Sequence, residues 1–332
     1  MFKLGKSLKL PIILAILLYV LLYFVRWQQG EWKIKTEILK DQRIFLTEQV
    51  KKFLPSPQAQ LLSGIVLGAK QDLPYELKFA LRDTSTLHIV VASGQYLTIL
   101  AGFIMHLSGL IKRKIAVSAT LVLIIVYTLL TGAQIPILRA AVMFFLASLA
   151  QTFGRQNDGL RVLIIVAGLF LLVNPRWITD LSFQLSFLAS FGVIVVAPIL
   201  EKVMNFLPNI IKENLAVTLG AQLLVIPVVA ANFHQLSYVS LFANVLVLWI
   251  IPYIMGVGFV FLLLGSLIPF LGQILSFALN IMLTYFIYIV EFFASLPFAW
   301  EYVGEFLWIV WVGYYLMITG ILLALEKKNH TQ

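Results

Sequence analysis

Long apolar runs separated by short polar segments dominate the chain, and most of them approach the roughly 20 residues that a helix needs to cross a bilayer. They predict about ten transmembrane helices, at residues 10–27, 85–110, 115–131, 135–153, 160–174, 180–200, 214–231, 238–267, 271–296 and 305–325. The run 238–267 is too long for one straight helix and contains Pro252, Gly256 and Gly258, so we expect it to be kinked or split. The pattern predicts an all-α polytopic membrane protein in which several helices are broken.

One long polar segment, residues 28–84, interrupts this pattern, and we expect it to lie outside the cell. Its first half alternates apolar with basic positions at helical spacing, the apolar ones being Ile34, Ile38, Phe45, Val50 and Phe53. This alternation predicts an amphipathic helix on the outer leaflet, ending at Pro55-Ser56-Pro57. We therefore divide the chain into an N-terminal transmembrane anchor (1–27), an external helix and linker (28–57), a polytopic domain (58–326) and a short tail (327–332).

Composition and charge support a membrane location. Of 332 residues, 61% are hydrophobic and 12% charged, whereas a soluble domain carries about 25% charged residues. The net charge is +9. Short segments expected in the cytoplasm hold twelve basic residues, whereas short external ones hold only Arg139 and Arg176. This distribution predicts that both termini face the cytoplasm across the cell membrane.

Few residues offer chemistry at membrane depth. The ionisable candidates are His88, Arg139, Asp180 and Glu291, each costly to insert. Arg139 and Asp180 fall near outer helix ends, where they are either anchors that reach the interface or one mutual ion pair. Glu291 lies inside an apolar run and needs a partner or a proton. With no cysteine and four scattered histidines, we expect no metal site or cofactor, and no enzyme.

The segment HIVVASGQYLT (88–98) concentrates hydrogen-bonding side chains in an otherwise apolar run. A regular helix would place His88 and Ser93 about 140° apart, which argues against nucleophilic catalysis by this pair. Gly94 weakens the helix, whereas His88 and Gln95, seven positions apart, would share one face.

Two stripes run along the segment DLSFQLSFLASFG (180–192). Small hydroxyls at i+4 steps form the first, which is typical of close helix packing: Ser182, Ser186 and Ser190. Amide, carboxylate and phenyl groups form the second, which fits either packing or a water-filled path with aromatic faces for bases: Asp180, Gln184, Phe187 and Phe191. Helix-breaking positions recur at Asn174-Pro175, Pro198, Pro227 and Pro252, a pattern that favours a permease or channel.

Four blocks of the chain, in family order, resemble the membrane domain of ComEC-type competence proteins. The first is LLSGIVLGAKQDLPYELKFALRDTSTLHIVVASGQY, which matches through Gly64, Gly68, Asp72, Thr84, His88, Ser93 and Gly94. The others match through Gly132, Arg139 and Ala140; through Asn174, Pro175, Asp180, Phe183, Gln184, Leu185, Ser186 and Phe187; and through Pro227, Phe233, Asn244 and Pro252. The chain departs from the family at Tyr96, where members commonly have His or Asn.

This resemblance implies a channel that imports single-stranded DNA during natural transformation. It implies partners on other chains: a cytoplasmic ATPase, a DNA receptor and a nuclease. We expect a stand-alone membrane domain, without the OB-like and metallo-β-lactamase-like domains of full-length members. The resulting candidate channel residues are His88, Ser93, Gly94, Gln95, Tyr96, Arg139, Asp180, Gln184 and Ser186. Two alternatives remain open, a transporter for another small anionic solute and a non-transporting scaffold for uptake or secretion partners.

Overall fold

The computed structural model describes residues 6–29, 38–90, 94–106, 113–152, 158–265, 267–304 and 308–330, which are helical apart from one two-stranded sheet. Three helices are long and apolar enough to cross a membrane: Leu181–Val203, Ile211–Phe233 and Pro269–Ala294. A fourth span is possible if Ser240–Leu248 and Ile251–Gly265 count together, and these two are bent by 41°. The kink predicted in 238–267 is therefore confirmed, as is the all-α class, whereas ten spans remain a prediction.

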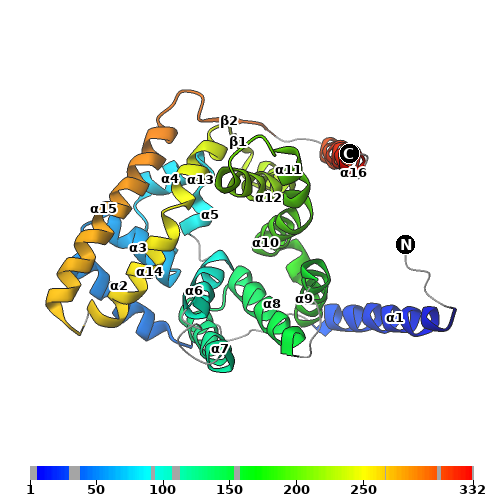
Figure 1. Ribbon diagram of the computed structural model, residues 1–332, viewed down its shortest axis with the longest axis horizontal. Helices are drawn as coiled ribbons and strands as arrows, with labels where there is room; N and C mark the ends of the chain where they lie inside the picture. The colour runs from blue at the N-terminus through cyan, green and yellow to red at the C-terminus, as the bar shows by residue number, and fades with distance from the viewer. Residues whose placement is uncertain are drawn as a thin grey trace.

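The larger of two hydrophobic cores, the first core, gathers segments that are far apart in the sequence. Its most deeply buried residues include Leu61, Leu81, Leu97, Ile254 and Phe286. It is built from α2 (Lys40–Phe53), α3 (Gln58–Leu67), α4 (Tyr75–Asp83), α5 (Leu87–Val90), α6 (Gly94–His106), α7 (Arg113–Leu130), α13 (Ser240–Leu248), α14 (Ile251–Val260) and α15 (Pro269–Ala294). Most of these helices lie together on the left of Figure 1.

The second core is smaller and lies on the other side of the molecule. Leu163, Val166 and Phe170 of α9 (Gly159–Val173) pack there against Phe183 and Phe187 of α10 (Leu181–Phe191). The short helix η3 (Pro175–Thr179) joins α9 to α10. α10 then continues through the π-helical turn η4 (Gly192–Val196) into α11 (Ala197–Val203).

Helix α8 (Ile135–Thr152) lies between the two cores, as its position in Figure 1 shows. Ile137 is buried in the first core, and Ala140 and Phe144 pack against it. Leu138 and Met143, on the other side of α8, pack against the second core. Arg139 therefore belongs to the helix that joins the two packed units.

Helix α3, part of the segment 28–84 that we expect to lie outside, is buried within the protein. Every residue from Leu61 to Leu67 is buried, and α3 contacts α5, α14 and α15. The sequence pattern placed this short apolar stretch in a polar segment because charged residues flank it. Ten residues cannot cross a bilayer, but they are enough for a helix buried inside the protein.

The predicted amphipathic helix is present as α2, and it packs onto the first core through one narrow face. Val50 is fully buried, and the Phe53 ring lies 5.6 Å from that of Phe261. Ile44 and Phe45 stay exposed on the opposite face. The part of the prediction that falls on residues 30–37 lies outside the described residues.

A proline inside α12 (Asn209–Phe233) is compensated by two tyrosines of α16 (Trp308–His330). Pro227 has no N–H to donate to the carbonyl of Leu223, four residues earlier. The Tyr314 hydroxyl donates to that Leu223 carbonyl at 2.9 Å, and the Tyr315 hydroxyl donates to the Leu224 carbonyl at 2.9 Å. The helix therefore keeps these two backbone acceptors satisfied near the proline in an apolar environment.

The N-terminal helix α1 (Lys6–Gln29) docks on α9 in a similar way. The Tyr19 hydroxyl donates to the Gly168 carbonyl at 3.2 Å. The Arg26 guanidinium donates to the carbonyls of Leu172, at 3.2 Å, and Val173, at 2.6 Å. These two carbonyls belong to the last turn of α9, where helix carbonyls have no partner within the helix and the helix dipole favours a cation.

Helices η4 and α12 cross at a pair of glycines. A Cβ atom at Gly192 would lie 2.1 Å from the Gly220 carbonyl oxygen. A Cβ atom at Gly220 would lie 2.9 Å from the Gly192 carbonyl oxygen. The two backbones are therefore in direct contact, as small residues allow in membrane helix packing.

The one sheet of the described residues was not predicted. Strand β1 (Gln235–Ser237) follows α12 and pairs antiparallel with β2 (Trp300–Tyr302), which follows α15. Three-residue strands give too short an alternation to be recognised in a sequence. Their pairing fastens the end of α12 to the segment that leaves α15.

Candidate functional site

Arg139 of α8 is the centre of the candidate site, and its guanidinium is held by α10. Its Nε donates to Ser186 Oγ at 2.8 Å, and its Nη1 donates to Ser190 Oγ and to Met143 Sδ, the latter at 3.6 Å. The Ser190 hydroxyl in turn donates to the Ser186 carbonyl at 2.9 Å, which turns its lone pairs toward the arginine. Two residues of the predicted serine stripe, Ser186 and Ser190, therefore lie at a helix contact and bind a cation, whereas Ser182 is exposed.

Gly94, the first residue of α6, approaches the same guanidinium from the first core. A Cβ atom at Gly94 would lie 2.8 Å from Arg139 Nη2, 3.0 Å from Ala140 Cβ and 3.0 Å from the Pro136 carbonyl oxygen. Only glycine leaves this space free. Three of the four sequence blocks therefore meet at one point between the two cores, through Gly94, Arg139 and Ser186.

The alternative in which Arg139 and Asp180 form one mutual ion pair is wrong. The Asp180 carboxylate accepts from the Phe183 N–H at 2.9 Å and caps the start of α10. Among the described residues, no carboxylate lies within ion-pair distance of Arg139. Asp180 is the usual type of residue at a helix N-cap, so its position before LSFQ was the overlooked signal.

The second stripe of α10 does not line a path along its whole length. Phe187 is buried in the second core, where its ring lies 4.4 Å from that of Phe183. The Gln184 side chain donates to the Ile178 carbonyl at 2.9 Å and so stabilises the turn before α10. Of the two alternatives for this stripe, packing therefore holds for Phe187, because burying a phenyl ring gains hydrophobic free energy.

The segment around His88 is described only on either side of residues 91–93. His88 lies exposed on α5, with its Nδ1 2.9 Å from the Ser85 carbonyl oxygen, and Gln95 lies exposed at the start of α6. The expectation that His88 and Gln95 share one face of a continuous helix therefore stays a prediction. Ser93 lies outside the described residues.

Tyr96, the position that departs from the family pattern, is buried in the first core. Its side chain is 1% exposed, as is that of Tyr127 on α7. Neither hydroxyl has a hydrogen-bond partner in the described part of the chain. Tyr127 carried no sequence signal, because a single tyrosine in an apolar helix is common.

The remaining motif residues shape the backbone or join elements. Gly68 ends α3 at φ 69°, and Gly132 occupies the turn before α8 at φ 81°, both in the left-handed region that suits glycine. A Cβ atom at Gly64 would meet Val90 at 2.6 Å. Three others make polar contacts: Asp72 forms an ion pair with Lys51 at 3.2 Å, Asn174 accepts from the Arg176 N–H at 3.1 Å, and Asn244 donates to the Ser240 carbonyl at 2.8 Å. Pro175 and Pro252 lie in the first turns of their helices, and Pro227 lies within α12.

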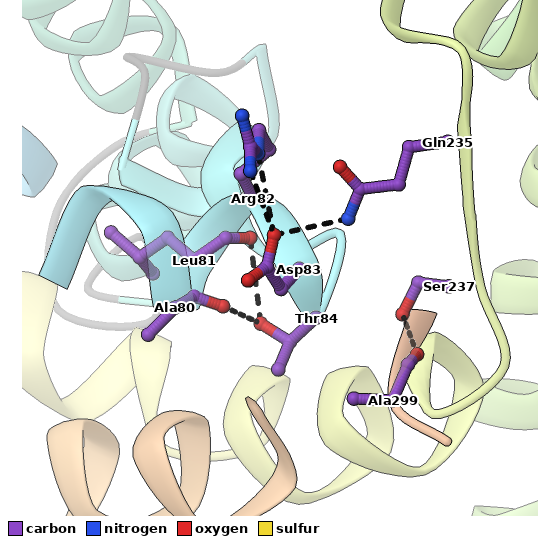
Figure 2. A network of polar contacts seen from close by, with 8 residues as sticks. All are labelled: Ala80, Leu81, Arg82, Asp83, Thr84, Gln235, Ser237 and Ala299. Atoms are coloured by element: carbon purple, nitrogen blue, oxygen red, sulfur yellow. Dashed lines mark hydrogen bonds and ion pairs between the residues drawn. The ribbon is translucent and has the colours of Figure 1, made fainter. Parts of the chain in front are cut away.

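A second polar network, missed in the sequence, joins α4 to β1. Figure 2 shows Asp83 between Arg82 and Gln235: its carboxylate accepts from Gln235 Nε2 at 3.0 Å and lies 3.3 Å from the Arg82 guanidinium. The Arg82 guanidinium also lies 4.6 Å from the centre of the Phe79 ring. Asp83 directly precedes the matched Thr84, which was the available signal. Glu291 is exposed in the last turn of α15 and joins neither network.

These features define an all-α membrane protein with a half-buried arginine between two helical cores. The chain belongs to the competence protein family, whose family model matches residues 65–328. It is 29% identical over 199 residues to ComE operon protein 3 of Bacillus subtilis, covering 58% of this chain and 25% of that protein. It is 27% identical over 223 residues to the uncharacterized protein YcaI of Escherichia coli, covering 60% of this chain and 28% of that protein. The chain thus matches about a quarter of each relative's length. No solved structure matches it.

Proposed function

We propose that this protein is a transmembrane path for single-stranded DNA in the uptake of DNA by competent cells. The observation that carries the proposal is the meeting of three family motifs at Arg139, between two separately packed cores. Ligand sites form preferentially where two packed units meet. A half-buried cation with no carboxylate partner among the described residues suits an anionic cargo better than a neutral or cationic one.

The rest of the proposed machinery lies on other chains. Strand movement needs energy, so we propose that a separate cytoplasmic ATPase pulls the strand. A separate receptor would deliver the DNA, and a separate nuclease would remove the complementary strand. The orientation we propose has both termini in the cytoplasm, as the distribution of basic residues predicts.

The test is DNA import into a competent host that carries the gene. We expect deletion of the gene to abolish the entry of labelled DNA into a nuclease-resistant state and to abolish transformation. Re-expression of the chain should restore both. Unchanged import after deletion would contradict the proposal, and flux of a small anion that DNA neither blocks nor follows would favour a solute transporter.

A further inference from the structure

The donors of Arg139 are only partly used. A guanidinium has five N–H donors in a planar fork. Nε and Nη1 are directed to Ser186, Ser190 and Met143, all on α10 or α8. Nη2 has no acceptor among the residues that the structure describes. In the described part of the chain, the N–H groups of Nη2 are therefore unused, while Nε and Nη1 are fixed by two serines.

Arg139 has no acidic partner among the described residues. Ser186 and Ser190 are neutral, and the nearest acidic residue of their motif block, Asp180, is engaged in capping α10. A half-buried cation that has only neutral partners is incompletely compensated, which costs stability. An anion that approached Nη2 would reduce this cost.

Gly94 leaves Nη2 uncovered by a side chain. It begins α6 next to Nη2, and a Cβ atom there would lie 2.8 Å from that nitrogen, so a larger residue would cover or displace it. Ser186 and Ser190 hold the rest of the guanidinium in place.

We propose that the Nη2 edge of Arg139 binds one phosphodiester group of the strand, so that Ser186, Ser190 and Gly94 position a phosphate-binding arginine inside the path. This inference rests on the proposed function, and it names the chemical group of the cargo that the site recognises. Recognition of a phosphate is independent of base sequence, as a general uptake path requires.

The first experiment measures binding of a fluorescent thymidine dodecamer to the full chain in nanodiscs of phosphatidylcholine. We expect Arg139→Gln to weaken binding about tenfold or more, because a hydrogen bond to a charged group is lost. The slope of log affinity against log salt concentration should fall by about 0.7, the value for one phosphate contact on a single strand. Arg139→Lys keeps the charge without the guanidinium fork, so its affinity should lie between those of wild type and Arg139→Gln.

Arg161→Gln is the matched control. Arg161 is exposed on α9 and already pairs with Asp158 at 2.8 Å, so the same charge change should leave the affinity and the salt slope unchanged. A dodecamer with a neutral methylphosphonate backbone provides a test that does not depend on a variant's folding. Wild type should bind this neutral strand far more weakly than the charged one, and Arg139→Gln should bind it as wild type does.

A phospholipid headgroup offers the same phosphodiester chemistry, so retention of phosphatidylglycerol is measured in parallel by native mass spectrometry. Equal retention of the lipid by wild type and Arg139→Gln supports the DNA strand as the ligand of this site. Loss of lipid with unchanged dodecamer affinity would show that the site binds lipid and overturn the inference. If deletion of the gene abolishes uptake but Arg139→Gln keeps the wild-type affinity and salt slope, the phosphate-binding inference fails while the proposed function stands. If import survives deletion, the proposed function itself fails.

Discussion

The glycine crossing between η4 and α12 allows a sharp test of the packing. Gly192 has φ −58° and ψ −45°, ordinary α-helical values, so alanine fits the backbone there without strain. The added Cβ atom would nevertheless lie 2.1 Å from the Gly220 carbonyl oxygen and 2.7 Å from the Gly220 carbonyl carbon. Both are backbone atoms, so no side-chain rotation relieves the contact, and the two helices must separate by roughly an ångström.

The free-energy difference follows from two opposing terms. Overpacking of this kind costs about 1–3 kcal/mol, whereas a glycine-to-alanine change in a helix gains up to about 1 kcal/mol in backbone terms. Gly102 on α6 is the matched control, because a Cβ atom there meets nothing within 4 Å. Gly102→Ala should therefore show only the gain. Because both variants share this gain, they should differ by the overpacking cost alone, about 1–3 kcal/mol.

Reversible unfolding of the purified protein in mixed micelles, followed by circular dichroism, measures this difference. We expect the unfolding midpoint to fall for Gly192→Ala and to stay level or rise for Gly102→Ala. Equal midpoints for the two variants would refute the close crossing of η4 and α12.

Two further predictions concern polar contacts. Removing the hydroxyl with Tyr314→Phe should lower the free energy of unfolding by about 0.5–1.5 kcal/mol. The loss should be much smaller in a Pro227→Ala background, because the new N–H can then donate to the Leu223 carbonyl. A double-mutant cycle in the same unfolding assay measures this coupling, and additive effects would contradict the role of Tyr314 at Pro227. Asp72→Asn removes the exposed ion pair with Lys51. It should lower the free energy of unfolding by no more than about 1 kcal/mol at low salt and by nothing measurable at high salt. A larger loss would contradict the interpretation of this contact as an ordinary surface ion pair.

Much of the helical architecture could be predicted from the sequence, because each apolar run carries its own signal. The kink in 238–267 followed from Pro252 and its neighbouring glycines. The burial of α3 could not be predicted, since a short apolar stretch has the same composition whether it covers the surface or fills a core. Only its tertiary contacts with α14 and α15 decide between these places.

The candidate site was predictable as a set of residues but not as an arrangement. Arg139 stood out because an ionisable group is rare in an apolar run, and the serine stripe of α10 indicated a helix contact. That these two features meet depends on how α8 and α10 pack, which no local pattern contains. The sequence could not decide between packing and a path for Phe187, because spacing along a helix does not show which face turns toward the core.

The two terminal helices share a mode of attachment whose consequence reaches beyond stability. Tyr19 and Arg26 on α1, and Tyr314 and Tyr315 on α16, direct the hydrogen bonds described above to main-chain carbonyls rather than to side chains. Every residue type presents the same carbonyl, so substitutions along α9 or α12 leave these acceptors in place. The partner surfaces of both terminal helices can therefore diverge in evolution without compensating changes in α1 or α16, and covariation between residue pairs would be a poor guide to where these two helices dock.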